Sequence, residues 1–484
     1  MKTIIRFKVL FGFLLLGSFY NAHAIELPKV ISDNMILQRN QIVNIWGKAK
    51  PYENITVTFK KQSKKTKADA QGKWQLLLDP LTASDIPSIM EINGEEEKIT
   101  LKNILVGDVW ICSGQSNMEY PLDRNLKKYA AAAKGIDVAM EELAKPKSDQ
   151  IRYLYAERKQ TGGDIKSVGW VTPAQDSIIR NISALGYFFA KEIHTEINIP
   201  IGIISTSWGG TRIEEWTPKT AYLNSNVFKD SIAGKENFTI DGLVPGQKFE
   251  SMFLPIVPFA VKGMLWYQGE SNCIIEDQLT YPEKMKLLVN TYRSLLKNPT
   301  MPFYYVQIAP YTYSNRKDKI KHSVEQLALF REAQTQCLSI INNSGMIIIS
   351  DLVDKTSDIH PPYKWEVGRR LALLALNKTY GKKIICSGPT YQSFKIEKNK
   401  MILSFDNVAG GLISNDGQPL NWFTIAGLDG NFVEAKAEIQ GKKIVVQSET
   451  VKNPVAVRFA WHEMAIPNLC NQSGLPAAPF RTDK

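Results

Sequence analysis

The stretch Gly107-Asp-Val-Trp-Ile-Cys-Ser-Gly-Gln-Ser-Asn-Met-Glu-Tyr120 decides the fold of this chain. Its apolar residues 109–112 predict a short buried strand, and the Ser113-Gly-Gln115 segment ends that strand in a tight turn. A serine between a strand and a following helix holds its hydroxyl clear of the backbone, beside the free N–H groups of the helix start. We therefore interpret Ser116 as a nucleophile. The alternative is that Ser116 or Ser113 only caps the helix.

After this stretch, strand and helix patterns alternate. Apolar runs predict strands at 151–155, 201–204, 261–266, 303–308 and 346–349, and helical spacing predicts helices at 183–197, 281–296, 324–336 and 364–376. This alternation is typical of an α/β fold with a doubly wound parallel sheet in a flavodoxin-like, three-layer arrangement. Because ligands bind at the carboxyl ends of the strands in such sheets, the polar residues that follow each strand are the candidate site.

The flanking regions have a different pattern. Short β-type runs separated by turn dipeptides such as Asn93-Gly94 come before the α/β region, and strands return after it. The predicted regions are a signal peptide at 1–24, an N-terminal β-sandwich-like domain at 25–105, a catalytic domain at 106–386 and a C-terminal β-rich region at 387–484.

The first 24 residues have the features of a signal peptide. A basic start with Lys2, Arg6 and Lys8 precedes an apolar segment at 9–19, and Ala22-His-Ala24 is a small-x-small cleavage pattern. We expect an exported protein, periplasmic or extracellular after cleavage near Ala24, with a retained anchor as the alternative. No later stretch is long and apolar enough to predict stable membrane insertion.

Charge and cysteine usage narrow the functional classes. Without the leader, the formal net charge falls from +11 to +8, and no basic helix or groove pattern predicts nucleic-acid binding. The five cysteines form no CxxC pair and no Cys/His cluster with zinc spacing. Because their number is odd, at least one cysteine is unpaired.

The second strand end, after residues 201–204, carries Trp208-Gly-Gly-Thr211 and then Arg212. Paired glycines allow backbone N–H groups to approach a ligand closely, as an oxyanion hole requires, and a tight turn without a ligand is the alternative. Arg212 offers a clamp for a carboxylate, and Trp208 offers an apolar wall for a sugar. The third strand end carries Gln268, whose amide is a further candidate oxyanion donor, and Glu270, a candidate orienting group.

The fourth strand end supplies the candidate base. Among His194, His322, His360 and His462, only His360 lies in a loop after a predicted strand with carboxylates nearby. A base for a serine must lie within hydrogen-bonding reach and must be held in the correct tautomer by a third group. His360 fits this requirement best.

Four motifs together resemble the SGNH/GDSL hydrolase superfamily, in particular its carbohydrate esterase branch, which includes sialate O-acetylesterases and acetylxylan esterases. These motifs, which follow the family's order, are Gly114-Gln-Ser-Asn-Met118, Trp208-Gly-Gly-Thr211, Trp266-Tyr-Gln-Gly-Glu-Ser-Asn272 and Asp358-Ile-His-Pro361. The flanks also resemble the longer sialate esterases, through Asn34-Met-Ile-Leu-Gln-Arg39 and Phe459-Ala-Trp461.

This resemblance implies an SGNH-type fold and an acyl transfer for which we expect no metal and no other cofactor. Ser116 would attack an O-acetyl carbonyl, and His360 would take its proton and return it to the sugar hydroxyl. The backbone N–H groups of Ser116 and Gly210, with the Gln268 amide, would hold the oxyanion. The superfamily often places its acid three residues before the histidine, where this chain has Ser357.

The carboxylate two residues before the histidine, Asp358, is therefore the predicted orienting acid. Asp354, or a backbone carbonyl in a Ser–His dyad, is the alternative. The predicted function is a serine esterase that removes O-acetyl groups from sugars or glycans, with sialic acids as the expected substrate. The alternatives are an acetylxylan esterase, a lipase or thioesterase on the same scaffold, and a non-catalytic carbohydrate-binding surface protein.

Overall fold

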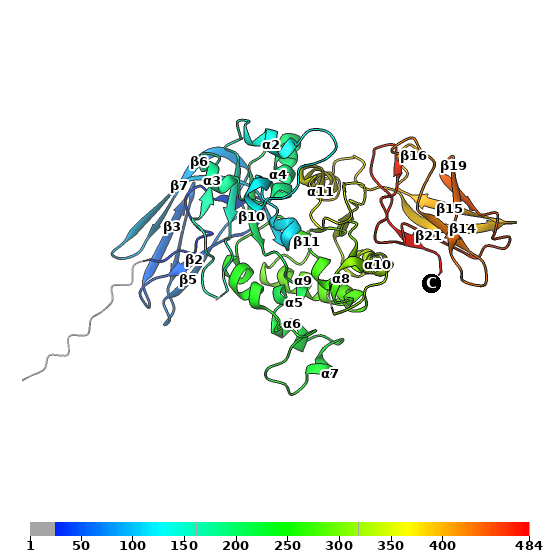
Figure 1. The fold of residues 1–484 in the computed structure, drawn as a ribbon. Coiled ribbons are helices and arrows are strands. Elements are labelled where there is room, and N and C mark those ends of the chain that lie inside the picture. Colours follow the sequence, from blue (N-terminus) through cyan, green and yellow to red (C-terminus); the bar gives the residue numbers. More distant parts are fainter. Residues whose placement is uncertain (1–24, 161, 318, 484) are drawn as a thin grey trace, which may run out of the picture.

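The computed structural model describes residues 25–160, 162–317 and 319–483, so the predicted signal peptide lies outside the described residues. Figure 1 shows a central α/β region between an N-terminal group of strands and a C-terminal group of strands. Within the described ranges, no helix is both long enough and apolar enough to span a membrane.

The N-terminal region consists of strands. β7 pairs with β6 and β1, β6 continues to β3 and β4, and β2 pairs with β5. The bounds are β1 (Ile36–Gln38), β2 (Val43–Lys48), β3 (Asn54–Phe59), β4 (Gln62–Lys67), β5 (Lys73–Leu78), β6 (Ser84–Asn93) and β7 (Lys98–Gly114).

The central sheet is built on the second half of β7. Its order is β13-β12-β11-β7-β10-β8-β9, and all neighbouring strands are parallel except β9, which runs antiparallel to β8. This confirms the predicted doubly wound parallel sheet. The bounds are β8 (Ile151–Tyr155), β9 (Trp170–Val171), β10 (Ile201–Ser207), β11 (Gly263–Tyr267), β12 (Phe303–Val306) and β13 (Ser344–Ile347).

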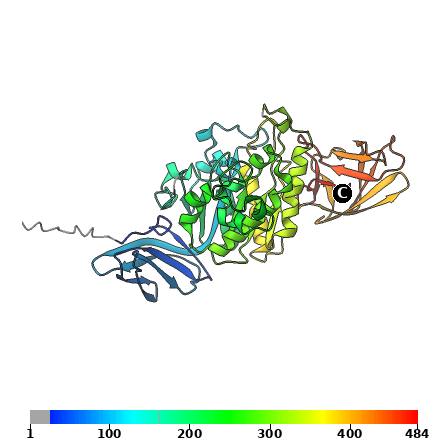
Figure 2. The same ribbon diagram turned by 90° about the horizontal axis from the view of Figure 1, so that it is seen from below.

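Helices cover both faces of this sheet. Figure 2 shows the helices gathered in the central region, between the N-terminal and the C-terminal strands. On one face, Trp110 of β7 contacts Phe189 of α4, and α4 packs against α11. On the other face, Trp266 of β11 contacts Trp216 of α5, which lies against α9, and α9 packs against α10. The helices are α1 (Ser116–Glu119), α2 (Val138–Leu143), α3 (Asp176–Ile179), α4 (Ala184–Ile197), α5 (Ile213–Trp216), α6 (Lys219–Leu223), α7 (Lys229–Ile232), α8 (Glu270–Ile274), α9 (Tyr281–Leu295), α10 (Gln326–Ile340) and α11 (Lys364–Lys378).

The C-terminal region has its own apolar core, separate from the core that the other two regions share. Two sheets form it, with orders β14-β15-β20-β19 and β18-β17-β21-β23, together with the pair β16–β22. The bounds are β14 (Thr390–Glu397), β15 (Lys400–Asp406), β16 (Leu412–Ser414), β17 (Phe423–Ala426), β18 (Val433–Glu434), β19 (Lys436–Gln440), β20 (Lys443–Gln447), β21 (Ala456–Phe459), β22 (Leu469–Asn471) and β23 (Phe480–Arg481).

β7 differs from the sequence prediction, because it is one continuous strand that includes the predicted run at 109–112 and begins before the predicted domain boundary, at Lys98. Gly107 allows this passage, since a Cβ there would lie 1.9 Å from the carbonyl oxygen of Pro200. Next to it, the buried carboxylate of Asp108 accepts hydrogen bonds from Arg39 at 3.0 Å and Gln38 at 2.8 Å. The boundary that we predicted after residue 105 therefore falls inside a strand that serves both sheets.

Candidate active site

The carboxyl end of β7 turns sharply into α1. Gly114 has φ +139°, and a Cβ there would lie 2.1 Å from the carbonyl oxygen of Tyr267, so only glycine fits without displacing its neighbour. The backbone N–H of Gln115 donates to the same Tyr267 oxygen at 3.0 Å. Ser116 is the first residue of α1, and its backbone N–H has no acceptor within the helix.

Ser116 and His360, which lie 244 positions apart in the sequence, meet at this turn. His360 Nε2 lies 2.9 Å from Ser116 Oγ, within hydrogen-bonding distance. The ring of Tyr129 lies 4.7 Å from the imidazole, and Tyr120 stacks on Tyr129. Burial, reinforced by the positive charge of Lys364, lowers the pKa of His360 to about 4, against the opposing effect of Asp358. The imidazole is therefore neutral at pH 7 and able to accept a proton.

Asp358 is the nearest acidic partner of this histidine, but it does not hydrogen-bond to the ring. Its Oδ1 lies 3.9 Å from His360 Nδ1 and accepts the backbone N–H of His360 at 2.9 Å. The Asp358 side chain is 39% exposed. Asp354, the alternative acid, is engaged elsewhere, because its two oxygens accept the Tyr363 hydroxyl and the Ala133 N–H.

The Trp208–Gly210 loop lies directly against the nucleophile. A Cβ on Gly209 would lie 3.2 Å from Ser116 Cβ, and the Gly209 N–H donates to Glu119 Oε2 at 3.0 Å. Gly210 has φ +78° and borders open space. Of the two glycines, Gly210 therefore remains the candidate oxyanion donor.

Gln268 is placed differently from the oxyanion role predicted for it. Its side chain is fully buried, and its amide nitrogen lies within hydrogen-bonding distance of three acceptors: Gln115 Oε1 at 3.1 Å, the Thr211 carbonyl at 3.3 Å and Asn272 Oδ1 at 2.7 Å. An amide nitrogen has only two hydrogens, and protein acceptors occupy them. Gln268 therefore stabilises the nucleophile turn through its hydrogen bond to Gln115.

Arg212, which we predicted to bind substrate, is also held by other parts of the protein. Its guanidinium donates to the Asp241 carbonyl at 2.8 Å and lies 3.9 Å from Glu214, and its side chain is only 11% exposed. The arginine next to the nucleophile is Arg158. A Cβ on Gly209 would lie 3.2 Å from both Arg158 Nη2 and Ser116 Cβ.

Arg158 makes a two-pronged ion pair with Glu119, at 2.7 and 2.5 Å, and its side chain is 44% exposed. The ring of Trp208 lies beside two cations, with Lys248 Nζ 4.0 Å and the Arg158 guanidinium carbon 5.5 Å from its centroid. A cavity of about 440 Å³ is lined by Arg158, Glu119 and Lys127, among others. The position of Arg158 shortly after the predicted strand 151–155 was the only sequence signal for it.

Two further residues were missed by sequence reasoning, namely Asn117 and Lys364. Asn117 follows the nucleophile within its motif, and Lys364 lies four residues after His360 at the start of α11. Asn117 donates to Glu270 Oε1 at 2.5 Å, and Lys364 donates to Asn117 Oδ1 at 2.8 Å. Glu270 is fully buried, and this burial raises its pKa.

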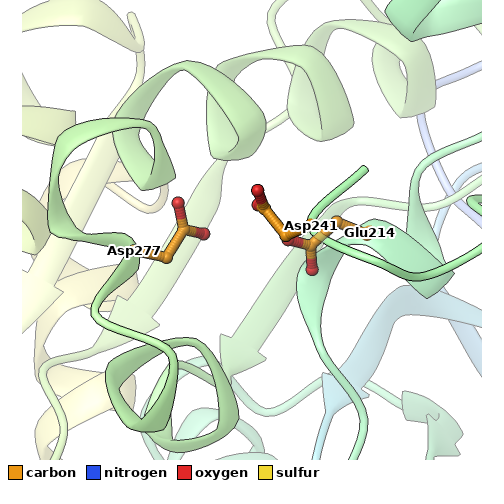
Figure 3. A group of neighbouring side chains, drawn as sticks. All are labelled: Glu214, Asp241 and Asp277. Atoms are coloured by element: carbon orange, nitrogen blue, oxygen red, sulfur yellow. The ribbon is translucent and has the colours of Figure 1, made fainter. Parts of the chain in front are cut away.

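An acidic cluster of Glu214, Asp241 and Asp277 lies behind the Arg212 loop. Figure 3 shows the three carboxylates turned toward one another. The ammonium of buried Lys284 donates to all three, at 2.8 Å for Glu214 and 2.7 Å for Asp277. Lys284 therefore supplies at this place the positive charge that a bound cation would supply.

Comparison with known proteins supports one family. A family model described as "Carbohydrate esterase, sialic acid-specific acetylesterase" matches residues 106–376. The human sialate O-acetylesterase is 27% identical over 409 residues, covering 77% of this chain and 75% of that protein, and the rat enzyme is 26% identical over 430 residues, covering 78% of each. The crystal structure of a carbohydrate acetylesterase from Xanthomonas citri superposes with a TM-score of 0.83 at 31% identity, covering 95% of this chain and 100% of that chain.

Proposed function

The chain belongs to the sialic acid-specific acetylesterase family of carbohydrate esterases, and from this membership we propose that it removes O-acetyl groups from sialic acids with Ser116 as nucleophile and His360 as base. It is a carboxylic ester hydrolase that acts on acetylated sugars. The observation that carries the proposed residue roles is the 2.9 Å distance between Ser116 Oγ and His360 Nε2.

The reaction proceeds in two acyl transfers. Ser116 Oγ forms a bond to the acetyl carbonyl carbon while its proton passes to His360 Nε2. The bond from that carbon to the sugar oxygen then breaks, and His360 returns the proton to the departing oxygen. Water attacks the acetyl-serine with the same base, which releases acetate and restores the Ser116 hydroxyl.

Oxyanion stabilisation is assigned to backbone donors. The N–H of Ser116 at the start of α1 and the N–H of Gly210 in the adjacent loop are the proposed pair, with Gln268 and Glu119 supporting them from behind. Asp358, 3.9 Å from His360 Nδ1, favours the imidazolium electrostatically. Removal of one oxyanion donor typically lowers kcat about 10²–10³-fold.

The residue roles are tested by Ser116→Ala and His360→Ala, assayed by acetate release from p-nitrophenyl acetate. We expect kcat to fall about 10⁴–10⁶-fold in each variant, since the nucleophile and its base act as a unit. Ser448→Ala and His462→Ala, in the C-terminal region, are the matched controls and should retain full activity. Wild-type rates for either active-site variant would remove that residue from the mechanism.

For the substrate, Arg158 supports an acidic sugar, because it is the partly exposed cation beside the nucleophile. We expect Arg158→Gln to raise KM for O-acetylated sialic acid about tenfold, the effect of one charge-assisted hydrogen bond, and to leave KM for p-nitrophenyl acetate nearly unchanged. Acetylated xylan is the comparison substrate. Faster acetate release from xylan than from sialoglycoprotein would favour the acetylxylan esterase alternative.

Export to the periplasm or the extracellular space is part of the same proposal. It is supported by the basic start, the apolar segment and the Ala22-His-Ala24 pattern of the leader. Cell fractionation with N-terminal sequencing tests it, and we expect a mature chain that begins at Ile25. A chain that keeps Met1 in the cytoplasm would contradict export.

A further inference from the structure

A lysine ammonium that contacts no carboxylate among the described residues is buried behind the proposed base. Lys364, the first residue of α11, is fully buried, and its Nζ donates to Asn117 Oδ1 at 2.8 Å and to the Pro361 carbonyl at 2.6 Å. Removing an ammonium from water is unfavourable, so its presence at this place requires a compensating arrangement. Burial lowers the pKa of Lys364 to about 7.

Lys364 and Asn117 together join the two halves of the site. Asn117 Nδ2 donates to the Ile359 carbonyl at 3.0 Å, and Lys364 Nζ donates to the Pro361 carbonyl at 2.6 Å. The carbonyls on both sides of His360 are therefore tied to the residue that follows Ser116.

The charged groups around Lys364 come from several elements. Glu270 of α8 and Asp358 of the histidine loop act on it as negative charges, and Glu270 is linked to it through Asn117. The rings of Tyr120 and Tyr267 lie 4.7 and 5.6 Å from Nζ. These rings stabilise the Lys364 ammonium through cation–π contacts.

We propose that Lys364 is a positioning residue, which holds the His360 loop against the nucleophile turn through Asn117 and disfavours a positive charge on the imidazole. The proposal rests on the proposed roles of Ser116 and His360. Two effects follow from it. The hydrogen bonds fix the Nε2-to-Oγ geometry, and the ammonium charge keeps His360 unprotonated in acid and favours return of its proton to the sugar oxygen.

The test separates charge from hydrogen bonding. Lys364→Gln removes the charge and retains a donor, and Lys364→Met removes both. We expect the acid limb of kcat/KM for p-nitrophenyl acetate to move upward by about one pH unit or more in both variants. We expect kcat at pH 8 to fall about tenfold in Lys364→Met and less in Lys364→Gln.

Lys378→Gln, at the other end of α11, is the matched control and should keep the wild-type pH profile. If Lys364→Met does not fold, an NMR titration of the His360 ring in Lys364→Gln replaces the kinetic assay. An unchanged midpoint in folded Lys364→Gln would overturn the proposal. If His360→Ala is inactive and the Lys364 variants titrate like wild type, only this inference fails, whereas an active His360→Ala would refute the proposed function.

Discussion

His360 combines two roles that its surroundings must reconcile, because it has to accept the Ser116 proton and must not be protonated by solvent. Burial and the Lys364 charge lower its pKa to about 4, so the neutral form predominates above that pH. We therefore expect kcat/KM to stay level from pH 7 to about pH 5 and to fall as the pH drops through about 4. The rate of acetate release across this range measures the pH dependence of kcat/KM, and tryptophan fluorescence confirms that the protein stays folded. If the acid limb had its midpoint near pH 6.5, burial and Lys364 would not lower the pKa of His360.

Asp358 should contribute less than the buried acid of a typical triad. Its carboxylate lies 3.9 Å from Nδ1, is partly exposed to solvent, and is also held by the His360 N–H. We expect Asp358→Asn to lower kcat about 10–100-fold, compared with about 10⁴-fold for a buried triad aspartate. The same assay of Asp354→Asn is the control and should show a smaller loss. A 10⁴-fold loss for Asp358→Asn would mean that the carboxylate closes on the ring in the substrate complex.

At single residues, the sequence predicted which strand ends converge better than it predicted where side chains point. Ser116 and His360 follow parallel strands, so their proximity could be inferred from the order of elements. The directions of Arg212 and Gln268 depend on partners from other segments, Asp241 for the first and Gln115 for the second. No local pattern contains that information.

At the scale of the element, the turn between β7 and α1 depends on Gly114. A Cβ at this position would meet the Tyr267 carbonyl at 2.1 Å, in a backbone conformation that already favours glycine. We expect Gly114→Ala to destabilise the protein by roughly 2–4 kcal/mol and to lower kcat, because the turn carries Ser116. Chemical denaturation and the esterase assay measure the two effects.

Gly417→Ala is the matched control, since Gly417 also has positive φ but has nothing within 4 Å of its Cβ position. It should cost about 1 kcal/mol and leave kcat unchanged. Equal losses of stability in the two variants would show that backbone conformation alone, and not the close approach to Tyr267, makes Gly114 necessary.

Secondary structure was predictable where apolar residues recur with a clear period. The helix predicted at 183–197 corresponds to α4, and the strand predicted at 151–155 corresponds to β8. β4 was missed because its sequence, Gln62–Lys67, is entirely polar and its alternate residues are exposed. It exists as a strand because it pairs with β3, a contact that its own composition does not signal.

At the scale of the whole molecule, the C-terminal region has an independent apolar core. Its described contacts with the central region include the ion pairs Arg481–Glu332 and Arg458–Glu325, both at 2.8 Å and both partly exposed to solvent. Such pairs contribute little each and are screened by salt. We expect two calorimetric transitions, which move further apart as salt is added, with the N-terminal and central regions unfolding together. A single transition at all salt concentrations would contradict this division.

The continuity of β7 also bears on how such a protein diversifies. Because Lys98–Gly114 pairs with strands on both of its sides in the N-terminal sheet and again in the central sheet, no crossover point between the two regions leaves both sheets intact. A homologous exchange of the first hundred residues would have to replace a strand that ends two positions before the nucleophile. An exchange of the amino-terminal module would therefore have to carry the reactive serine with it, whereas the carboxy-terminal module has an apolar core of its own and shares no strand with the central sheet.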